Sequence, residues 1–220
     1  MREDIKAVIF DQDGLMFDTE RISVEAWHIM GEAWGIHLEE AFLSTIRGMN
    51  IPDAAERFRQ ELGGSVDYLK FKEAKQERFE AMLRQKPVPV KPGLRELLAY
   101  LKEHGYKIAM ATASTQEYSM ENLRDAGITD FFDYIITGDM VEHAKPDPEV
   151  FLKSAEALGE RPEHCMVLED SLNGVEAGIR GGFFTVMVPD LTQPDDVLRS
   201  RVDRVCTSLL EVKEMLEGLS

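Results

Sequence analysis

Two carboxylates stand one residue apart near the start of the chain. Asp11 and Asp13 follow the apolar run 7–10, and Gly14 comes directly after them. On an extended backbone, residues i and i+2 point to the same side and lie about 7 Å apart, from a rise of roughly 3.3 Å per residue. That separation is too large for a shared proton. It suits two tasks, in which one carboxylate attacks a centre while the other handles a proton or helps to hold a cation. A pair of solvated acids at an Asp-Gly turn is the alternative.

Later apolar runs with the character of strands are also followed by segments with polar side chains. These segments contain Thr112, Ala113 and Ser114 after 107–111, Lys145 in the loop after 134–137, and Glu169 and Asp170 after 166–168. In an open α/β sheet, ligands bind at the carboxyl ends of the strands. We therefore expect four carboxylates, a hydroxyl and a lysine to converge on one crevice.

Each of these residues also has a purely structural interpretation. Ser114 begins the pattern S-T-Q-E, which is typical of a helix capping box. Asp147, directly before Pro148, is typical of a helix N-cap with proline at the first helical position. Lys145 alone could be a surface lysine, and the acidic pair 169–170 could cap the helix that follows.

The residues taken together favour chemistry over coincidence. Four carboxylates in one cleft would repel one another, and a hard divalent cation with oxygen ligands, such as Mg²⁺, would relieve that repulsion. With the ion bound, Lys145, the Thr112 hydroxyl and helix N-termini could hold a phosphate dianion. The set points to phosphoryl transfer through an acyl phosphate on an aspartate, because mutually perturbing charges at a strand-end cleft are typical of functional sites.

The composition excludes several classes of partner. The net charge is −16 over 220 residues, whereas nucleic acid and anionic membranes need a basic surface. No apolar run approaches the roughly 18 residues of a membrane span, and the N-terminus has no apolar signal-peptide core. We expect a cytoplasmic protein that binds neither nucleic acid nor membrane. No heptad pattern suggests a coiled coil, so we expect a monomer, with Cys165 and Cys206 as free buried thiols.

The elements that must position these residues fall into two groups. The segment 19–86 has helical spacing throughout and no convincing strand. Val24, Trp27, Met30 and Trp34 recur every three to four residues, which indicates packing between helices rather than stacking on a cofactor. Further helices are predicted at 39–46, 52–62 and 66–83. This segment is predicted to be an all-helical insert after the first strand.

Two crossings connect the insert with the rest of the chain. They are 15–19 and the proline-rich 86–92, and we predict hinge motion there. Beyond 92, helices predicted at 93–104, 116–126, 148–158, 173–180 and 209–216 alternate with strands predicted at 107–111, 134–137, 166–168, 184–188 and 204–206. Such alternation predicts an α/β fold, a Rossmann-like parallel sheet with helices on both faces.

This arrangement resembles the haloacid dehalogenase superfamily, in its phosphatase and β-phosphoglucomutase-like subfamily with a helical cap. The matching motifs are D-Q-D-G at 11–14, D-T-E at 18–20, Thr112, H-A-K-P-D-P at 143–148 and E-D-S-x-x-G at 169–174. Each motif is weak alone, but all of them in order over essentially the whole chain are highly specific. The resemblance implies a core domain of 1–18 and 87–220, a cap domain of 19–86, and a first strand lying between the second and the fourth.

The resemblance implies roles for the acidic residues. Asp11 would be the nucleophile that becomes phosphorylated, and also a metal ligand. Asp13 would protonate the leaving oxygen and then activate water, while its backbone carbonyl contacts the metal. Asp170, supported by Glu169, would complete the Mg²⁺ site.

Further residues match positions that bind substrate in this family. Thr112, Ala113 and Ser114 would bind the phosphoryl group together with Lys145, which would also orient Asp11. Arg47 lies in the cap segment that faces the active site in relatives, and a surface arginine is its alternative.

Two cap positions bear on the reaction. In β-phosphoglucomutases a histidine and a cap arginine act on the sugar phosphate. By the resemblance, the corresponding positions here look like Ser23 and Ile51. Dehalogenating relatives lack the second aspartate, so Asp13 favours phosphate chemistry. We therefore expect a Mg²⁺-dependent phosphatase that hydrolyses a small phosphorylated metabolite, such as a sugar phosphate, through an aspartyl-phosphate. A β-phosphoglucomutase-like mutase is the alternative.

Other classes fit less well. A phosphoacceptor signalling module carries an adjacent acidic pair after the first strand and no large insert. A binding protein on an inactive hydrolase scaffold is disfavoured because no expected core residue is missing. A phosphonate hydrolase would need a Schiff-base lysine in the cap, which the sequence does not single out.

Overall fold

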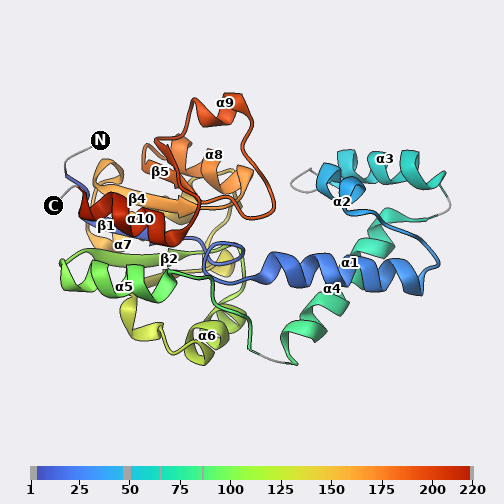
Figure 1. Cartoon of the computed structure of the whole chain (residues 1–220), viewed down its shortest axis with the longest axis horizontal. Coiled ribbons are helices and arrows are strands. Elements are labelled where there is room, and N and C mark those ends of the chain that lie inside the picture. Colours follow the sequence, from blue (N-terminus) through green and yellow to red (C-terminus); the bar gives the residue numbers. More distant parts are fainter. Residues whose placement is uncertain (1–3, 47–50, 65, 86, 219–220) are drawn as a thin grey trace. The chain divides into compact units, whose positions relative to one another are not determined.

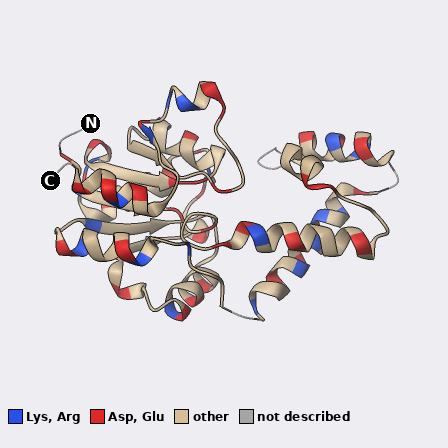
Figure 2. Ribbon diagram, viewed as in Figure 1, with Lys and Arg blue, Asp and Glu red and all other residues tan. Residues whose placement is uncertain are grey.

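The computed structural model describes residues 4–46, 51–64, 66–85 and 87–218 (Figure 1). The chain separates into two compact units, which we call the larger unit (Met1–Asp18 and Pro89–Ser220) and the helical unit (Thr19–Val88). Lys and Arg are interspersed with Asp and Glu along the helices of each unit (Figure 2). None of the described helices combines the length and the apolar content that crossing a bilayer requires.

The larger unit is built on a parallel sheet with the strand order β3-β2-β1-β4-β5-β6. The strands are β1 (Ala7–Phe10), β2 (Lys107–Ala111), β3 (Tyr134–Ile136), β4 (Cys165–Glu169), β5 (Phe184–Met187) and β6 (Arg204–Val205). Phe10 of β1 pairs in register with Met110 of β2 and with Leu168 of β4. The predicted parallel sheet, with the first strand between the second and the fourth, is confirmed.

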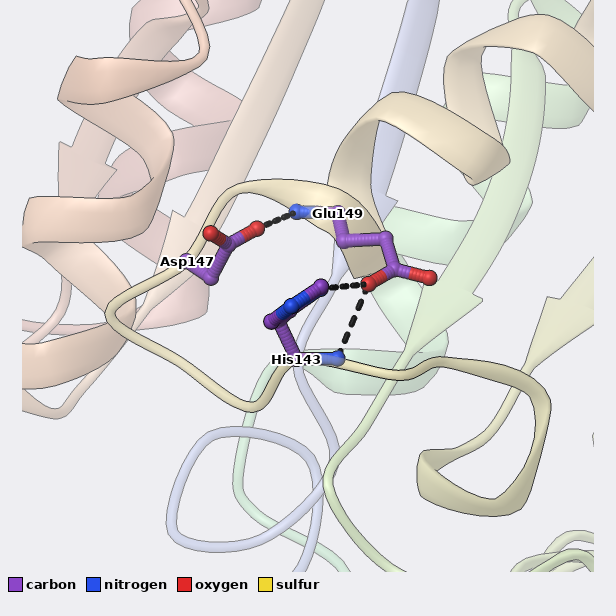
Figure 3. A group of neighbouring side chains, drawn as sticks. All are labelled: His143, Asp147 and Glu149. Atoms are coloured by element: carbon purple, nitrogen blue, oxygen red, sulfur yellow. Dashed lines mark hydrogen bonds and ion pairs between the residues drawn. The ribbon is translucent and has the colours of Figure 1, made fainter.

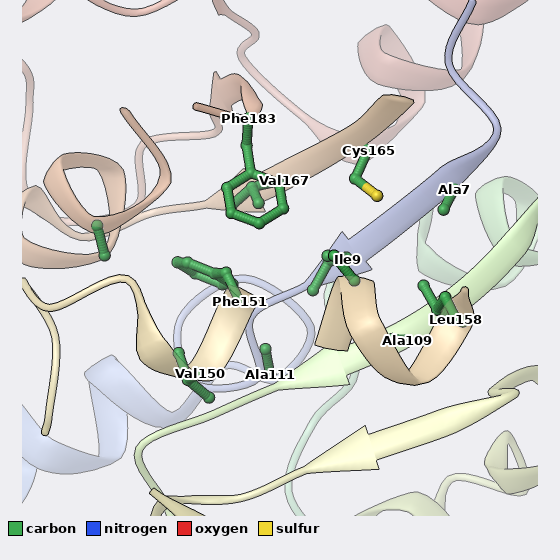
Figure 4. Packing of buried hydrophobic residues seen from close by; sticks show 12 residues of the cluster. Ala7, Ile9, Ala109, Ala111, Val150, Phe151, Leu158, Cys165, Val167 and Phe183 are labelled. Carbon is green, nitrogen blue, oxygen red and sulfur yellow. The ribbon is translucent and has the colours of Figure 1, made fainter. Parts of the chain in front are cut away.

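Helices cover both faces of this sheet, and α5 and α10 lie in front of it in Figure 1. The helices of the larger unit are α5 (Leu94–Glu103), α6 (Gln116–Asp125), α7 (Glu149–Leu158), α8 (Leu172–Arg180), α9 (Asp196–Arg199) and α10 (Leu209–Glu217). Ala7 and Ile9 of β1 and Phe151 of α7 belong to one buried cluster, which also contains Cys165 (Figure 4). Burial from both sides explains why the β1 sequence is apolar without alternation. Cys165 and Cys206 are buried free thiols, as predicted.

The helical unit contains α1 (Thr19–Ala33), α2 (Glu40–Ile46), α3 (Ile51–Leu62) and α4 (Tyr68–Leu83). Its core is aromatic, with Phe58 and Phe71 wholly buried. Trp27 of α1 stacks on Phe71 with ring centroids 5.5 Å apart, so the predicted packing role of Trp27 is confirmed. Trp34 lies at the margin, 41% exposed, with its ring edge-on to Phe71.

The two crossing segments are tied together inside the larger unit. Phe17 forms an antiparallel bridge with Val90. The ammonium of Lys91 lies 3.2 Å from a carboxylate oxygen of Asp18 and 2.8 Å from one of Asp190, and its side chain is 15% exposed. These contacts fix the ends of both crossings, and the predicted hinge motion stays a prediction.

Lys75 of α4 is a buried cation within the helical unit. It is 7% exposed, donates to the Ser23 hydroxyl at 2.6 Å, and lies 4.8 Å from the ring centroid of Phe79. Burial lowers the pKa of Lys75 to about 8, with a nearby Glu20 acting to raise it and Lys72 to lower it further. The folded state therefore binds the Lys75 proton less tightly than the unfolded chain does.

This burial predicts a pH-dependent effect of Lys75→Met. Between pH 8 and the ordinary lysine pKa, the unfolded chain binds more protons than the folded protein does, so stability rises with pH. The free-energy cost of burying the charged Lys75 is therefore full below pH 8 and becomes smaller as the pH rises above 8. We expect the variant to be more stable than the wild type at pH 7, and this gain to be smaller at pH 10 by about 2 kcal/mol. Urea unfolding followed by tryptophan fluorescence measures it, because Trp27 and Trp34, the two tryptophans of the chain, both lie in the helical unit.

Lys70→Met is the matched control, since Lys70 lies on the same helix with its side chain 75% exposed. That variant should show no such difference between the two pH values. An equal gain for Lys75→Met at pH 7 and pH 10 would contradict the predicted effect.

Candidate active site

The carboxyl end of β1 delivers Asp11 into a buried ion-pair group. Asp11 is 7% exposed, and its backbone N–H donates to the Leu168 carbonyl at 3.0 Å, which continues the β1–β4 ladder. The Lys145 ammonium lies 2.5 Å from the Asp11 carboxylate and 2.8 Å from that of Glu169. It also donates to the Ala111 carbonyl at the end of β2, at 3.2 Å. The structure thus brings Asp11, Lys145 and Glu169 together, from the ends of β1 and β4 and from the loop that precedes α7.

The charges in this group shift the pKa values of Asp11 and Lys145. Burial raises the pKa of Asp11 to about 8, with Lys145 acting against burial and Glu169 and Asp13 acting with it. Burial acts to lower the pKa of Lys145, but the charges of Asp11 and Glu169 outweigh burial and raise it. Lys145 therefore stays an ammonium ion, while Asp11 holds its proton at neutral pH. If Asp11 were ionised, the three side chains would carry more negative than positive charge. A further cation beside Asp11 would favour its ionised, nucleophilic form.

Asp11, Glu169 and Asp170 are disposed as the ligands of a cation. One oxygen from each lies within 4.8 Å of the others, and all three residues are buried. Glu169 also accepts from the Ser171 backbone N–H at 2.8 Å and from the Ser171 hydroxyl at 2.9 Å. Gly14 has φ +84°, and a Cβ there would overlap the Asp170 carboxylate. The all-oxygen donor set and its uncompensated negative charge fit a hard divalent cation.

Asp13 is held by two hydroxyl groups. The Ser114 hydroxyl donates to Asp13 Oδ2 at 2.6 Å, and the Tyr118 hydroxyl donates to Oδ1 at 3.3 Å. The capping-box interpretation of Ser114 is therefore wrong. Thr115 is the N-cap of α6, and the Ser114 side chain turns to Asp13. Sequence reasoning missed Tyr118, which lies in the first turn of α6 and carried no motif of its own.

The remaining predicted residues have different surroundings. Thr112 is buried at the end of β2, 1% exposed, and its hydroxyl accepts from the Ser114 backbone N–H at 3.0 Å. Ala113 is exposed, and its carbonyl lies so close to Gly138 that a Cβ there would overlap it. Arg47 lies outside the described residues.

The loop that carries Lys145 is ordered by its own polar contacts. His143, Asp147 and Glu149 lie together there (Figure 3). Glu149 accepts from the His143 backbone N–H at 2.9 Å and lies 3.0 Å from the His143 ring Nδ1, a bond that raises the pKa of His143. Asp147 accepts from the Glu149 backbone N–H at 3.0 Å, but the N-cap of α7 is Pro148, one residue later than the predicted cap at Asp147. These contacts position Lys145.

The family model of the haloacid dehalogenase-like hydrolases matches residues 5–182. The chain belongs to this family. The "Phosphorylated carbohydrates phosphatase" of Thermotoga maritima is 35% identical to it over 191 residues, which cover 81% of this chain and 82% of that protein. The β-phosphoglucomutase of Bacillus subtilis is 30% identical over 190 residues, covering 84% of this chain and 83% of that enzyme.

A solved haloacid dehalogenase-family structure shares the fold. The hydrolase from Deinococcus radiodurans, crystallised with bound phosphate and sodium, has a TM-score of 0.81 and is 28% identical, with 99% of this chain and 97% of that one covered. The predicted family is therefore confirmed. Together with the relatives named as phosphatases, the family places this chain among the phosphoric monoester hydrolases.

The cluster of Asp11, Glu169 and Asp170 predicts that a divalent cation stabilises the protein. Mg²⁺ would relieve the repulsion between Asp11 and Asp170, and at ten times its dissociation constant it should raise Tm by about 3 °C. Asp170→Asn should reduce that rise. Thermal unfolding with Mg²⁺ and with chelator measures the effect.

Glu96→Gln is the matched control, because it removes one carboxylate from the exposed side of α5 and should keep the full rise in Tm. A wild-type Tm that does not respond to Mg²⁺, or an equal response in Asp170→Asn, would contradict the predicted cation site.

Proposed function

We propose that this protein is a Mg²⁺-dependent phosphatase that hydrolyses a small phosphorylated metabolite through an aspartyl-phosphate on Asp11. The observation that carries the proposal is the buried Asp11 carboxylate at the end of the central strand, paired with Lys145. Asp13, two residues further along, accepts from the hydroxyl groups of Ser114 and Tyr118, and more distantly, at 3.5 Å, from the side-chain amide of Gln12. Asp11 thus has a fixed cation beside it, whereas these contacts of Asp13 are with neutral groups.

The proposed reaction has two steps. In the first, an Asp11 oxygen attacks phosphorus, the bond from phosphorus to the ester oxygen breaks, and Asp13 gives its proton to that oxygen. In the second, water attacks the phosphoryl group, Asp13 takes a proton from the water, and the bond from Asp11 to phosphorus breaks. Lys145, Thr112 and the backbone of Ala113 and Ser114 would bind the phosphoryl oxygens.

The proposed metal ligands are Asp11, Asp170 and the backbone carbonyl of Asp13, with Glu169 in support. Both Glu169 oxygens already accept from other groups, Oε1 from Lys145 and Oε2 from Ser171, which suits a supporting role. When bound, Mg²⁺ supplies positive charge that offsets the carboxylates and the phosphoryl group.

We propose that the helical unit is a cap domain that excludes water and selects substrate. Its separate aromatic core and its two covalent connections to the larger unit support that role. Closure and opening of such domains gate many enzymes.

A sugar phosphate is the proposed substrate class. The Thermotoga maritima relative is named for phosphorylated carbohydrates, and a β-phosphoglucomutase relative supports a mutase as the second candidate. By the resemblance, Ser23 corresponds to the histidine of the β-phosphoglucomutases, and its hydroxyl accepts from Lys75. The absence of a histidine at this position favours hydrolysis over the mutase reaction. The cytoplasmic location and the monomeric state stay predictions.

Phosphate release tests the function directly. With Mg²⁺ and a panel of phosphorylated metabolites, we expect the wild type to release phosphate from sugar phosphates. Chelator or Asp11→Asn should abolish release, and Asp13→Asn should lower turnover by a factor of about 10²–10⁴ because general acid–base catalysis is lost.

The Mg²⁺-induced rise in Tm is the control, and Asp13→Asn should keep it, because the variant retains the backbone carbonyl. Near-normal turnover in Asp13→Asn would refute its assigned role. A sugar phosphate that is isomerised without free phosphate would support the mutase.

A further inference from the structure

We propose that Tyr118 is a positioning residue that holds the Asp13 carboxyl group in place for proton transfer to the leaving oxygen. The inference rests on the proposed phosphatase function and deepens it, because neither the sequence motifs nor the family resemblance assigns a role to this tyrosine. Tyr118 acts through Asp13, so it is not itself a catalytic residue.

The geometry around Asp13 supports this role. Its two oxygens have one hydroxyl donor each, Ser114 at 2.6 Å from Oδ2 and Tyr118 at 3.3 Å from Oδ1. Donors to Oδ2 alone, which are Ser114 and, at 3.5 Å, the Gln12 side-chain amide, would leave the carboxyl group able to rotate about its own bond. Two donors on opposite oxygens fix the plane of the group, and with it the direction in which either oxygen presents a proton.

The hydroxyl chemistry also suits a group that alternates between acid and base. A phenol or a serine hydroxyl donates to a carboxylate and accepts from a carboxylic acid, whereas an ammonium or guanidinium only donates. Ser114 and Tyr118 can therefore keep contact with Asp13 in both protonation states. Lys145, which only donates, contacts Asp11 instead.

The placement of Tyr118 makes its hydroxyl a rigid partner. It lies in the first turn of α6, next to Ser119, which is wholly buried and follows it along the helix. Burial and then the Asp13 charge raise the pKa of Tyr118, so its hydroxyl keeps its proton. An aromatic side chain with few rotatable bonds holds a distant hydroxyl with little loss of conformational entropy.

The test compares two leaving groups in Tyr118→Phe, which removes the hydroxyl and keeps the ring. An alkyl phosphate needs a proton on its leaving oxygen, whereas 4-nitrophenolate leaves without one. The ratio kcat/KM reports the steps up to departure of that group. We expect kcat/KM to fall about tenfold for a sugar phosphate and less than twofold for 4-nitrophenyl phosphate, both with Mg²⁺.

Two further variants sharpen the comparison. Asp13→Asn should show the same selectivity for leaving group with a larger loss. In the Asp13→Asn background, Tyr118→Phe should change kcat/KM for the sugar phosphate less than twofold, because a residue that acts through Asp13 has nothing left to position. Tyr134→Phe, at a 49% exposed position at the start of β3, should leave kcat/KM unchanged for both substrates.

The outcomes separate the two proposals. Equal losses for both substrates in Tyr118→Phe, or an undiminished loss in the Asp13→Asn background, would indicate a structural role and overturn the inference. Unchanged kcat/KM for the sugar phosphate would also overturn it while leaving the phosphatase function intact. A wild type that releases no phosphate from any substrate would instead refute the proposed function.

Discussion

The buried ammonium of Lys145 is the interaction on which the site depends. It lies between Asp11 and Glu169, which would otherwise face one another as uncompensated carboxylates at the ends of neighbouring strands. Breaking a buried ion pair by removing one partner typically costs about 3–5 kcal/mol. The ring of Phe151, 4.6 Å from the ammonium at its centroid, adds a cation–π contact from the start of α7. Lys145 thus joins the ends of two strands to the loop that precedes α7.

The sheet topology makes this group possible. Phe10 and Leu168 are register partners, so the next residues along β1 and β4, Asp11 and Glu169, reach the same edge of the sheet. The crossover places Thr112 at the end of β2, on the other side of β1. A ligand at the end of β1 therefore meets side chains from both neighbouring strands, as expected at the point where the strand order of an open α/β sheet reverses.

The sequence predicted most of this architecture because the apolar runs that form the strands stand directly before polar residues of the site. The run before Asp11 is apolar since β1 is buried on both faces, and the parallel alternation of elements then puts the other polar segments at the same edge. The surroundings of Asp13 could not be predicted in this way. The local pattern at Ser114 favours a helix cap, yet the hydroxyl bonds across to Asp13, and the rotation of α6 that aims Tyr118 is set by packing. The short helix α9 was also missed, because four residues carry no helical period.

The ion pairs of Lys91 and the Phe17–Val90 bridge constrain how the two crossing segments can move. A single flexible linker lets an attached unit rotate about every backbone bond, but Phe17 and Val90 are bridged and Lys91 holds Asp18 and Asp190. Two neighbouring segments joined in this way can flex together, while twisting one around the other would break the bridge. Because the ion pairs are largely shielded from solvent, dissolved salt screens them less than it screens surface charges. We therefore expect the predicted hinge motion to be flexion rather than torsion, over a wide range of ionic strength.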